Sequence, residues 1–308
     1  MRCRKCAQKA IIKLPRHNTA FCPSCFDEYV LDQVRRAIKS DQMMTRQDRI
    51  AVAVSGGKDS LALWDILLRL GYHCAGIHIN LGIGDYSRLS QEKAEQFARH
   101  CNSDLIVHDL KENYGAGIPE LAEETHRPPC SACGVMKRYN FNRLAQEAGF
   151  TVLATGHNLD DESARLLGNV LHWQQDYLDK QAPALPSTHS KLLKKVKPLF
   201  RLAEREMAAY CVLRKIDYIV EECPMSRDAK QLVYKDMLNR LEEQIPGTKQ
   251  NFYLEFLKRR RPDIPELDAR LKDCARCGQP TTAQICSHCK LVETLSATKN
   301  IPAGETLR

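Results

Sequence analysis

The chain has 308 residues and the composition of an ordinary globular protein, with 43% hydrophobic and 27% charged residues. It contains no apolar run long enough to span a bilayer and no apolar signal core after Met1. This excludes an integral membrane protein and predicts a cytoplasmic protein without a membrane partner. The net charge of +8, with basic clusters at Lys191–Lys197 and Lys258–Arg261, favours a polyanionic partner.

Fourteen cysteines are many for a cytoplasmic chain, where disulfides are rare and metal-binding or catalytic thiols are the better interpretation. The first two C-x-x-C pairs lie in residues 1–27, a segment too short to form a hydrophobic core of its own. Two such pairs close a tetrahedral site, so we expect an N-terminal zinc finger that folds around structural Zn²⁺. Residues 28–49 follow as a linker helix. The four expected zinc ligands are Cys3, Cys6, Cys22 and Cys25.

After the linker, the apolar run Ile50–Val54 indicates a buried strand, and a helical pattern follows it at Leu61–Leu70. Between them lies the string SGGKDS, whose glycines allow a sharp turn close to a ligand and whose helix start attracts an anion. The Walker A and dinucleotide-binding glycine patterns do not fit this string. It resembles instead the pyrophosphate loop of the PP-loop ATP pyrophosphatases, which implies cleavage of ATP between its α- and β-phosphates. The loop residues are Ser55, Gly56, Gly57, Lys58, Asp59 and Ser60.

From residue 50 onward, strand and helix patterns alternate, which predicts one α/β catalytic domain of residues 50–222. Four strand patterns and the strand-like segment Tyr218–Val220 together predict a parallel five-stranded sheet with helices on both faces. Ligands of such sheets bind beyond the carboxyl ends of the strands, so residues 55–60, 78–80 and 155–157 should meet over one pocket. The other strands are expected at 50–54, 74–79, 105–108 and 151–154.

The string GHNLDD, residues 156–161, places two carboxylates at a helix start. Gly156 allows close backbone approach to a ligand. Asp160 and Asp161 next to a nucleotide pocket could hold Mg²⁺, which takes one or two carboxylates together with phosphate oxygens. An ordinary N-cap with an acidic first turn is the competing interpretation.

The string PPCSACG, residues 128–134, carries Cys130 and Cys133 into a helix that also contains Lys137. A helix start and nearby cations favour thiolates, and Cys223 is expected at the same edge of the sheet because it follows Tyr218–Val220. Three thiolates with one open position favour an iron–sulfur cluster over structural zinc. The alternative is a redox pair, Cys130 and Cys133, that carries a disulfide or persulfide.

The last part of the chain divides into three segments. Residues 223–272 are predicted to form a helical region with basic faces, and residues 273–294 a second, tighter zinc finger. Residues 295–308 are expected to be a flexible tail. The ligands of the second zinc site are Cys274, Cys277, Cys286 and Cys289.

These motifs, taken in order, resemble the two-zinc-finger tRNA 2-thiouridine synthetases over nearly the whole chain. The segments 133–139 and 156–173 are more similar to the TtuA branch, which thiolates ribothymidine in the T loop, than to the branch that acts on the wobble uridine. The resemblance implies the PP-loop fold, which is adenine nucleotide alpha hydrolase-like. It also implies ATP-dependent replacement of the uridine C2 oxygen by sulfur.

The resemblance also implies functions for particular positions and partners. Residues 55–60 bind the ATP phosphates with Ala53 and Ile79 near the nucleotide, Lys137 and Asp161 are needed for catalysis, and Cys130, Cys133 and Cys223 hold a [4Fe–4S] cluster whose fourth iron binds sulfide. The implied cofactors are ATP, Mg²⁺, this cluster and two Zn²⁺. The implied partners are tRNA and a ubiquitin-like carrier with a C-terminal thiocarboxylate, or another sulfide donor, and the enzyme is expected to be a homodimer.

Two other classes of protein remain as alternatives. One is a PP-loop enzyme that needs no iron, either a cytidine-to-lysidine ligase or a persulfide-type thiouridylase, which an assay for iron and acid-labile sulfide distinguishes. The other is a non-catalytic zinc protein that binds nucleic acid, which ATP-dependent pyrophosphate release with tRNA would exclude. Such a binding module has no need of the SGGKDS string.

Overall fold

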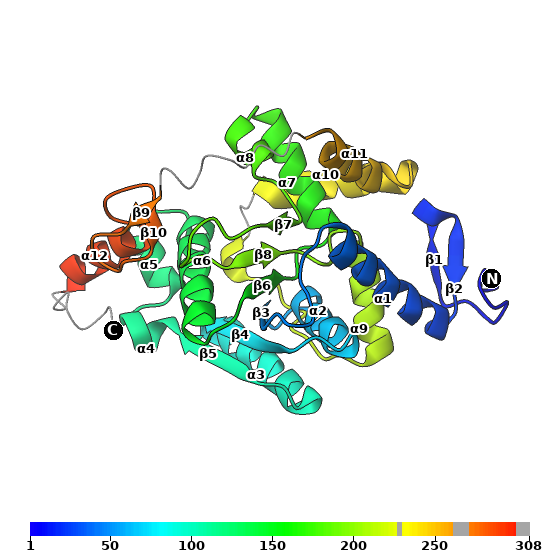
Figure 1. Cartoon of the computed structure of the whole chain (residues 1–308), viewed down its shortest axis with the longest axis horizontal. Coiled ribbons are helices and arrows are strands. Elements are labelled where there is room, and N and C mark those ends of the chain that lie inside the picture. The colour runs from blue at the N-terminus through cyan, green and yellow to red at the C-terminus, as the bar shows by residue number, and fades with distance from the viewer. Residues whose placement is uncertain (227–229, 261–270, 300–308) are drawn as a thin grey trace.

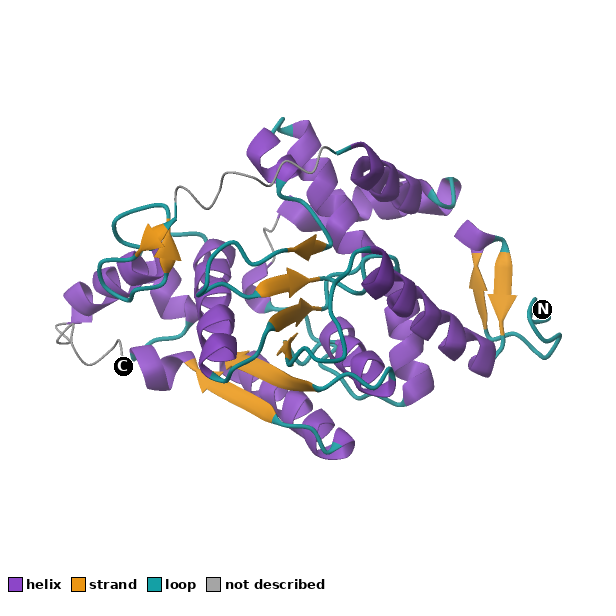
Figure 2. Cartoon of the chain, viewed as in Figure 1, coloured by secondary structure: helices purple, strands orange, loops and turns teal. Residues whose placement is uncertain are grey.

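The computed structural model describes residues 1–226, 230–260 and 271–299, and its centre within these ranges is a six-stranded sheet (Figures 1 and 2). The strand order is β5-β4-β3-β6-β8-β7. Neighbouring strands run parallel except β7, which pairs antiparallel with β8 at one edge. The five parallel strands confirm the predicted sheet and β7 adds a sixth. The strands are β3 (Ile50–Val54), β4 (Cys74–Asn80), β5 (Leu105–Asp109), β6 (Val152–Thr155), β7 (Ala184–Leu185) and β8 (Lys194–Val196).

The predicted identity of the fifth parallel strand was wrong. β8 occupies that place beside β6, whereas Tyr218–Val220 forms no strand. Val196 of β8 is fully buried, so one apolar side chain and the pairing with β6 suffice for a strand that the sequence presents as a run of lysines. Val220 is 76% exposed, and the segment instead contacts the phosphate loop, where Ile219 N donates to Gly56 O at 3.0 Å.

Helices cover both faces of the sheet because alternate side chains of the central strand point to opposite sides. Ile50, Val52 and Val54 of β3 pack in a core shared with the helices α1, α2 and α9. Ala51 of β3 packs on the other side, with Ala145 of α6. The helices are α1 (Pro23–Ser40), α2 (Lys58–Arg69), α3 (Gly84–Cys101), α4 (Leu110–Tyr114), α5 (Ile118–Glu124), α6 (Pro129–Glu147), α7 (Leu159–Leu171), α8 (Gln175–Asp179), α9 (Glu204–Arg214), α10 (Lys230–Gln244), α11 (Thr248–Arg259) and α12 (Ser287–Lys299).

The two cysteine-rich modules lie at opposite ends of the long axis of the molecule (Figure 1). The N-terminal one is a hairpin of β1 (Ile12–Leu14) and β2 (Thr19–Phe21), joined by the short 3₁₀ helix Pro15–His17. The C-terminal one contains β9 (Lys272–Asp273), β10 (Pro280–Thr281) and α12. Because α12 continues to Lys299, the tail predicted from residue 295 begins with helix. Residues 300–308 lie outside the described residues, as do residues 261–270 of the predicted helical region.

None of the helices in the described ranges is both long enough and apolar enough to cross a membrane.

Candidate nucleotide site and metal centres

The phosphate loop, residues 55–60, joins β3 to α2 in a conformation that requires glycine at residue 56. Gly56 has a φ of 75°, and a Cβ added to it would lie 2.3 Å from Ser90 O. Hydrogen bonds fix the turn: Ser55 N donates to Ser60 Oγ at 3.1 Å, and Ser90 Oγ donates to Ser55 O at 2.5 Å. The loop therefore presents the positive end of α2 at the carboxyl end of β3, where an anion is favoured.

A cavity of about 590 Å³ opens where β3, β4 and β6 end. Its volume lies in the range of small-molecule sites. Gly156, after β6, comes so close to the phosphate loop that a Cβ there would lie 2.9 Å from Ser60 N. The three strand ends thus meet over one pocket, as the sequence predicted. The predicted site residues that line it are Ala53, Ser55, Asp59, Ser60, Ile79, Lys137 and Gly156.

Cationic side chains form one wall of this nucleotide cavity. Burial lowers the pKa of Lys195 and that of Lys197, and Glu162 lies 2.8 Å from Lys197 Nζ. Burial also lowers the pKa of His157 to about 4, so this ring is neutral at pH 7. The wall suits a polyanionic ligand such as a nucleotide or an RNA backbone. Its cationic members are Lys137, Arg138, Arg165, Lys195 and Lys197.

A second cavity, of about 1030 Å³, also borders the phosphate loop. Gly57, Lys58 and Cys223 line it, and it shares Ser55 and Asp59 with the nucleotide cavity. The third predicted thiol and the phosphate loop therefore border the same space.

Asp161, one of the two carboxylates considered for Mg²⁺, is joined to Asp59 of the phosphate loop by Asn158. Asn158 Nδ2 donates to Asp59 Oδ1 at 3.0 Å, and Asn158 N donates to Asp161 Oδ2 at 3.1 Å. Burial raises the pKa of Asp59, and Asp161 raises it further, although Lys58 opposes both. Two acids beside a phosphate loop fit the donor set of Mg²⁺. Asp160 points elsewhere, because its Oδ1 lies 2.6 Å from Lys249 Nζ.

Cys130, Cys133 and Cys223 come together at the start of α6. Cys130 Sγ donates to Met225 O at 3.6 Å. Burial raises the pKa of Cys130, and its neighbours Cys133 and Cys223 add to the rise. Cys133 and Cys223 also pack at the border of a hydrophobic cluster that contains Met136.

The spacing of these three thiols differs from that of a zinc site. Among the residues that the structure describes, the groups whose ligand atoms all lie within 4.8 Å of one another are the two four-cysteine groups. Cys130, Cys133 and Cys223 are not such a group, so at least two of their Sγ atoms lie more than 4.8 Å apart. Three thiols with this spacing fit the ligand set of an iron–sulfur cluster better than that of a single Zn²⁺.

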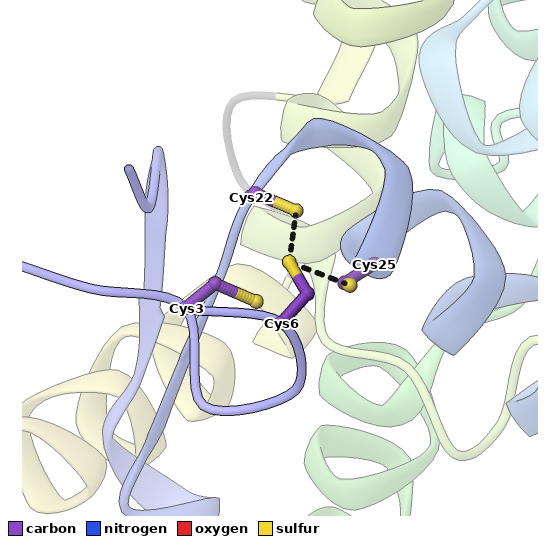
Figure 3. A group of neighbouring side chains, drawn as sticks. All are labelled: Cys3, Cys6, Cys22 and Cys25. Atoms are coloured by element: carbon purple, nitrogen blue, oxygen red, sulfur yellow. Dashed lines mark hydrogen bonds between the residues drawn. The ribbon is translucent and has the colours of Figure 1, made fainter. Parts of the chain in front are cut away.

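The two four-cysteine groups fit tetrahedral zinc. Four thiolates at about 2.3 Å from Zn²⁺ lie about 3.8 Å apart. In the N-terminal group, Cys6 Sγ lies 3.5 Å from Cys22 Sγ and 3.6 Å from Cys25 Sγ (Figure 3). In the C-terminal group, the Sγ atoms of Cys274 and Cys289 lie 3.9 Å apart, and those of Cys277 and Cys286 lie 3.7 Å apart.

Sequence reasoning missed several residues beside the phosphate loop and nucleotide cavity. Lys195 and Lys197 alternate around the apolar Val196, so a period of two was present in the basic run and could have indicated a strand. Glu204 at the start of α9 and Lys235 in the middle of α10 contact the loop or the start of α7, yet nothing in their sequence neighbourhood indicates it.

Comparisons with known proteins match both the domain and the motifs. A family model described as a PP-loop domain matches residues 29–231, and one described as the N-terminal LIM domain of the 2-thiouridine synthetase TtuA matches residues 2–27. The chain is 47% identical to the tRNA-5-methyluridine(54) 2-sulfurtransferase of Thermus thermophilus over 94% of this chain and 91% of the relative. It is 44% identical to the protein of the same name from Pyrococcus horikoshii over 94% of this chain and 93% of the relative.

A solved structure shares the whole architecture. The U34-tRNA thiolase NcsA from Methanococcus maripaludis, determined with its [4Fe–4S] cluster, superposes with a TM-score of 0.81 at 25% identity. The superposition covers 96% of this chain and 96% of that chain.

Proposed function

This chain belongs to the TtuA family of PP-loop tRNA 2-sulfurtransferases, and we propose that it uses ATP to replace the C2 oxygen of 5-methyluridine 54 in tRNA with sulfur. One observation supports this most strongly. The phosphate loop, Lys137 and Gly156 border one cavity, and Cys223, a neighbour of Cys130 and Cys133, lines the second cavity that shares Ser55 and Asp59 with it.

In this proposal, the chain first binds ATP. The loop amides and the positive end of α2 bind the β- and γ-phosphates, and Ala53 and Ile79 contact the nucleoside. Gly156 lets the end of β6 lie directly against the loop that binds the phosphates, because any side chain there would collide with the loop backbone. Asp59 and Asp161 would hold Mg²⁺, which offsets negative charge on the phosphates.

The uridine C2 oxygen then attacks the α-phosphorus, a new P–O bond forms, and pyrophosphate leaves. Lys58 and Lys137 stabilise the charge that develops on the phosphates. The product is an AMP ester of the uridine oxygen, and AMP is a far better leaving group than oxide. Salt-dependent binding of the tRNA backbone to basic surfaces of the chain orients the uridine.

Cys130, Cys133 and Cys223 would hold a [4Fe–4S] cluster. When bound, such a cluster supplies the sulfur nucleophile that displaces AMP from C2. The chain would contribute three thiolate ligands, and Lys137 lies about one turn after Cys133 on the same helix, α6. The sulfur donor, a ubiquitin-like thiocarboxylate carrier or another sulfide source, and the homodimer stay predictions.

The proposal is tested by anaerobic purification of the wild type and of C223A. Wild-type protein should contain iron and acid-labile sulfide, release pyrophosphate with tRNA and ATP, and form 5-methyl-2-thiouridine, which mass spectrometry of tRNA nucleosides detects. C223A should lose the cluster absorbance and thiolation but keep ATP binding. Full activity of C223A would remove this residue from the site, and 2-thiouridine at the wobble position instead of position 54 would overturn the substrate.

A further inference from the structure

A closed ring of ion pairs and hydrogen bonds surrounds the phosphate loop. Lys58 Nζ lies 3.1 Å from Asp59 Oδ2 and 2.6 Å from Glu204 Oε1. Lys235 Nζ lies 2.6 Å from the other oxygen of Glu204 and 2.9 Å from Asp161 Oδ1. Asn158 closes the ring through its bonds to both aspartates. The charge ring is therefore Asp59, Lys58, Glu204, Lys235, Asp161 and Asn158.

The ring joins four elements that are far apart in sequence. Lys58 and Asp59 begin α2, Asn158 is the N-cap of α7, Glu204 begins α9, and Lys235 lies within α10. Its ion-paired side chains are mostly buried, with Lys235 only 18% exposed. Burial raises the pKa of Glu204, but Lys235 and Lys58 outweigh this and lower it to about 2, so Glu204 is an anion at pH 7.

The two carboxylate oxygens of Glu204 each pair with a different lysine, Lys58 and Lys235. While Lys58 pairs with Glu204, its charge is partly neutralised, so it offers its full charge to a phosphate only by leaving Glu204. Glu204 then still has Lys235, which also pairs with Asp161, so neither carboxylate is left unpaired beside the incoming phosphates. If the charge of Lys235 were removed, Glu204 would repel the nucleotide and would hold Lys58 more strongly.

We propose that Lys235 and Glu204 are positioning residues for ATP, which release Lys58 to the phosphates while keeping Asp161 in place. This inference rests on the proposed function, because it assigns Lys58 to the pyrophosphate of ATP. Lys235 acts through Glu204 and Asp161 and does not itself contact the nucleotide.

The test compares K235Q, K235R, E204Q and the double variant K235Q/E204Q with the wild type. Pyrophosphate release with tRNA is measured against ATP concentration, and thermal unfolding is measured in parallel. K235Q should raise the KM for ATP about tenfold and change kcat less, while K235R, which keeps the charge, should recover most of the loss. Adding E204Q to K235Q should lower the KM again, because the unpaired anion is gone.

A matched control is K93Q. Lys93 is a lysine of similar exposure, 25%, whose Nζ lies 2.6 Å from Oδ2 of the exposed Asp217, and neither residue lines a cavity or belongs to the charge ring. K93Q should leave the KM for ATP unchanged.

Provided that the wild-type protein is active, two results would overturn the inference. The first is a KM for ATP of K235Q within about twofold of that of K93Q. The second is a KM for ATP of the double variant K235Q/E204Q that is no lower than that of K235Q. The second would mean that Lys235 only supports the fold. If wild-type protein released no pyrophosphate with tRNA and ATP, the proposed function itself would fall, and this inference with it.

Discussion

The two glycines of the phosphate loop differ in what surrounds them. At Gly56 a Cβ would collide with the backbone of Ser90, and the φ of 75° is unfavourable for any other residue. We expect G56A to cost about 1–2 kcal/mol in stability from backbone conformation alone, with a further loss from the collision. Because the loop must shift, ATP binding should be lost, as measured by calorimetry with the zinc-loaded protein.

G57A is the control for this prediction. Gly57 has a φ of −85°, and its Cβ would meet only Ser55 Oγ at 3.5 Å. G57A should fold with nearly wild-type stability. If G56A and G57A lowered stability and ATP binding equally, the positive φ of Gly56 would not be required for the conformation of the loop.

His78, in the wall of the nucleotide cavity, should make stability depend on pH. Burial lowers its pKa from 6.5 to about 4, with Lys137 adding to the shift, although the hydrogen bond of Nδ1 to Val54 O opposes it. Between pH 4 and pH 6.5, His78 is therefore protonated to a greater extent in the unfolded chain than in the folded protein. The stability from this group is therefore complete above pH 6.5 and is lost as the pH falls toward 4.

The variant H78N keeps an N–H donor for Val54 O but does not titrate. The loss of unfolding free energy between pH 7 and pH 5 should be about 2 kcal/mol smaller in H78N than in the wild type. Urea unfolding at the two pH values measures it. An unchanged difference would show that the imidazole is charged or solvated in the folded protein.

Individual site residues could be predicted from the sequence where a single short segment contains all the residues of a motif. SGGKDS and the C-x-x-C pairs were found because their residues are adjacent and their spacing has a chemical meaning. Glu204 and Lys235 could not be found, because their role depends on helix packing that brings α9 and α10 to the loop. A lysine in the middle of an amphipathic helix is otherwise expected to be a solvated charge.

Helix α6 connects the thiol site to the C-terminal zinc module. The Tyr139 ring stacks on His288 with centroids 3.5 Å apart and packs against the C-terminal cysteine cluster, where burial raises the pKa of Cys277 and the Tyr139 hydroxyl opposes this rise. Y139F keeps the stack and removes the hydroxyl from beside a zinc ligand. We expect the affinity of the C-terminal site for Zn²⁺ to fall about tenfold or more, as is usual when a polar group beside a metal ligand is lost.

Competition with a chromogenic chelator measures this loss, and the N-terminal zinc of the same protein is the internal control. Its ligands lie at the far end of the molecule and should release their metal at the wild-type rate. Equal release from both sites in wild type and variant would contradict a role for the Tyr139 hydroxyl.

The elements themselves were predictable to different degrees. β3, β4 and β6 are apolar and buried, so their patterns were unambiguous, and their helices follow at the expected places. β8 was missed because two of its three residues are lysines, one of which lines the nucleotide cavity. Tyr218–Val220 has the composition of a strand, but it forms none. The edge of β6 to which it would have to pair is already occupied by β8.

For the whole molecule, a buried ion pair joins the N-terminal module to the catalytic domain. Arg16 Nη2 lies 2.5 Å from Glu206 Oε2 of α9, and both side chains are at most 5% exposed. R16M should destabilise the zinc-loaded protein by about 3–5 kcal/mol, because it leaves Glu206 buried and unpaired. R16M/E206M should recover most of this loss.

Guanidinium unfolding of the two variants at constant zinc measures the difference. A double variant as unstable as R16M would show that the cost comes from lost packing and not from the unpaired carboxylate. A wild-type value for R16M would mean that the two units are not coupled through this pair.

The hydrogen bond from Ile219 N to Gly56 O connects the phosphate loop to the segment that leads to Cys223, four residues later. In the proposed reaction, the loop that binds ATP and one cysteine of the thiol site would therefore be coupled through a few residues of backbone, so that a shift of the loop on ATP binding would also displace Cys223.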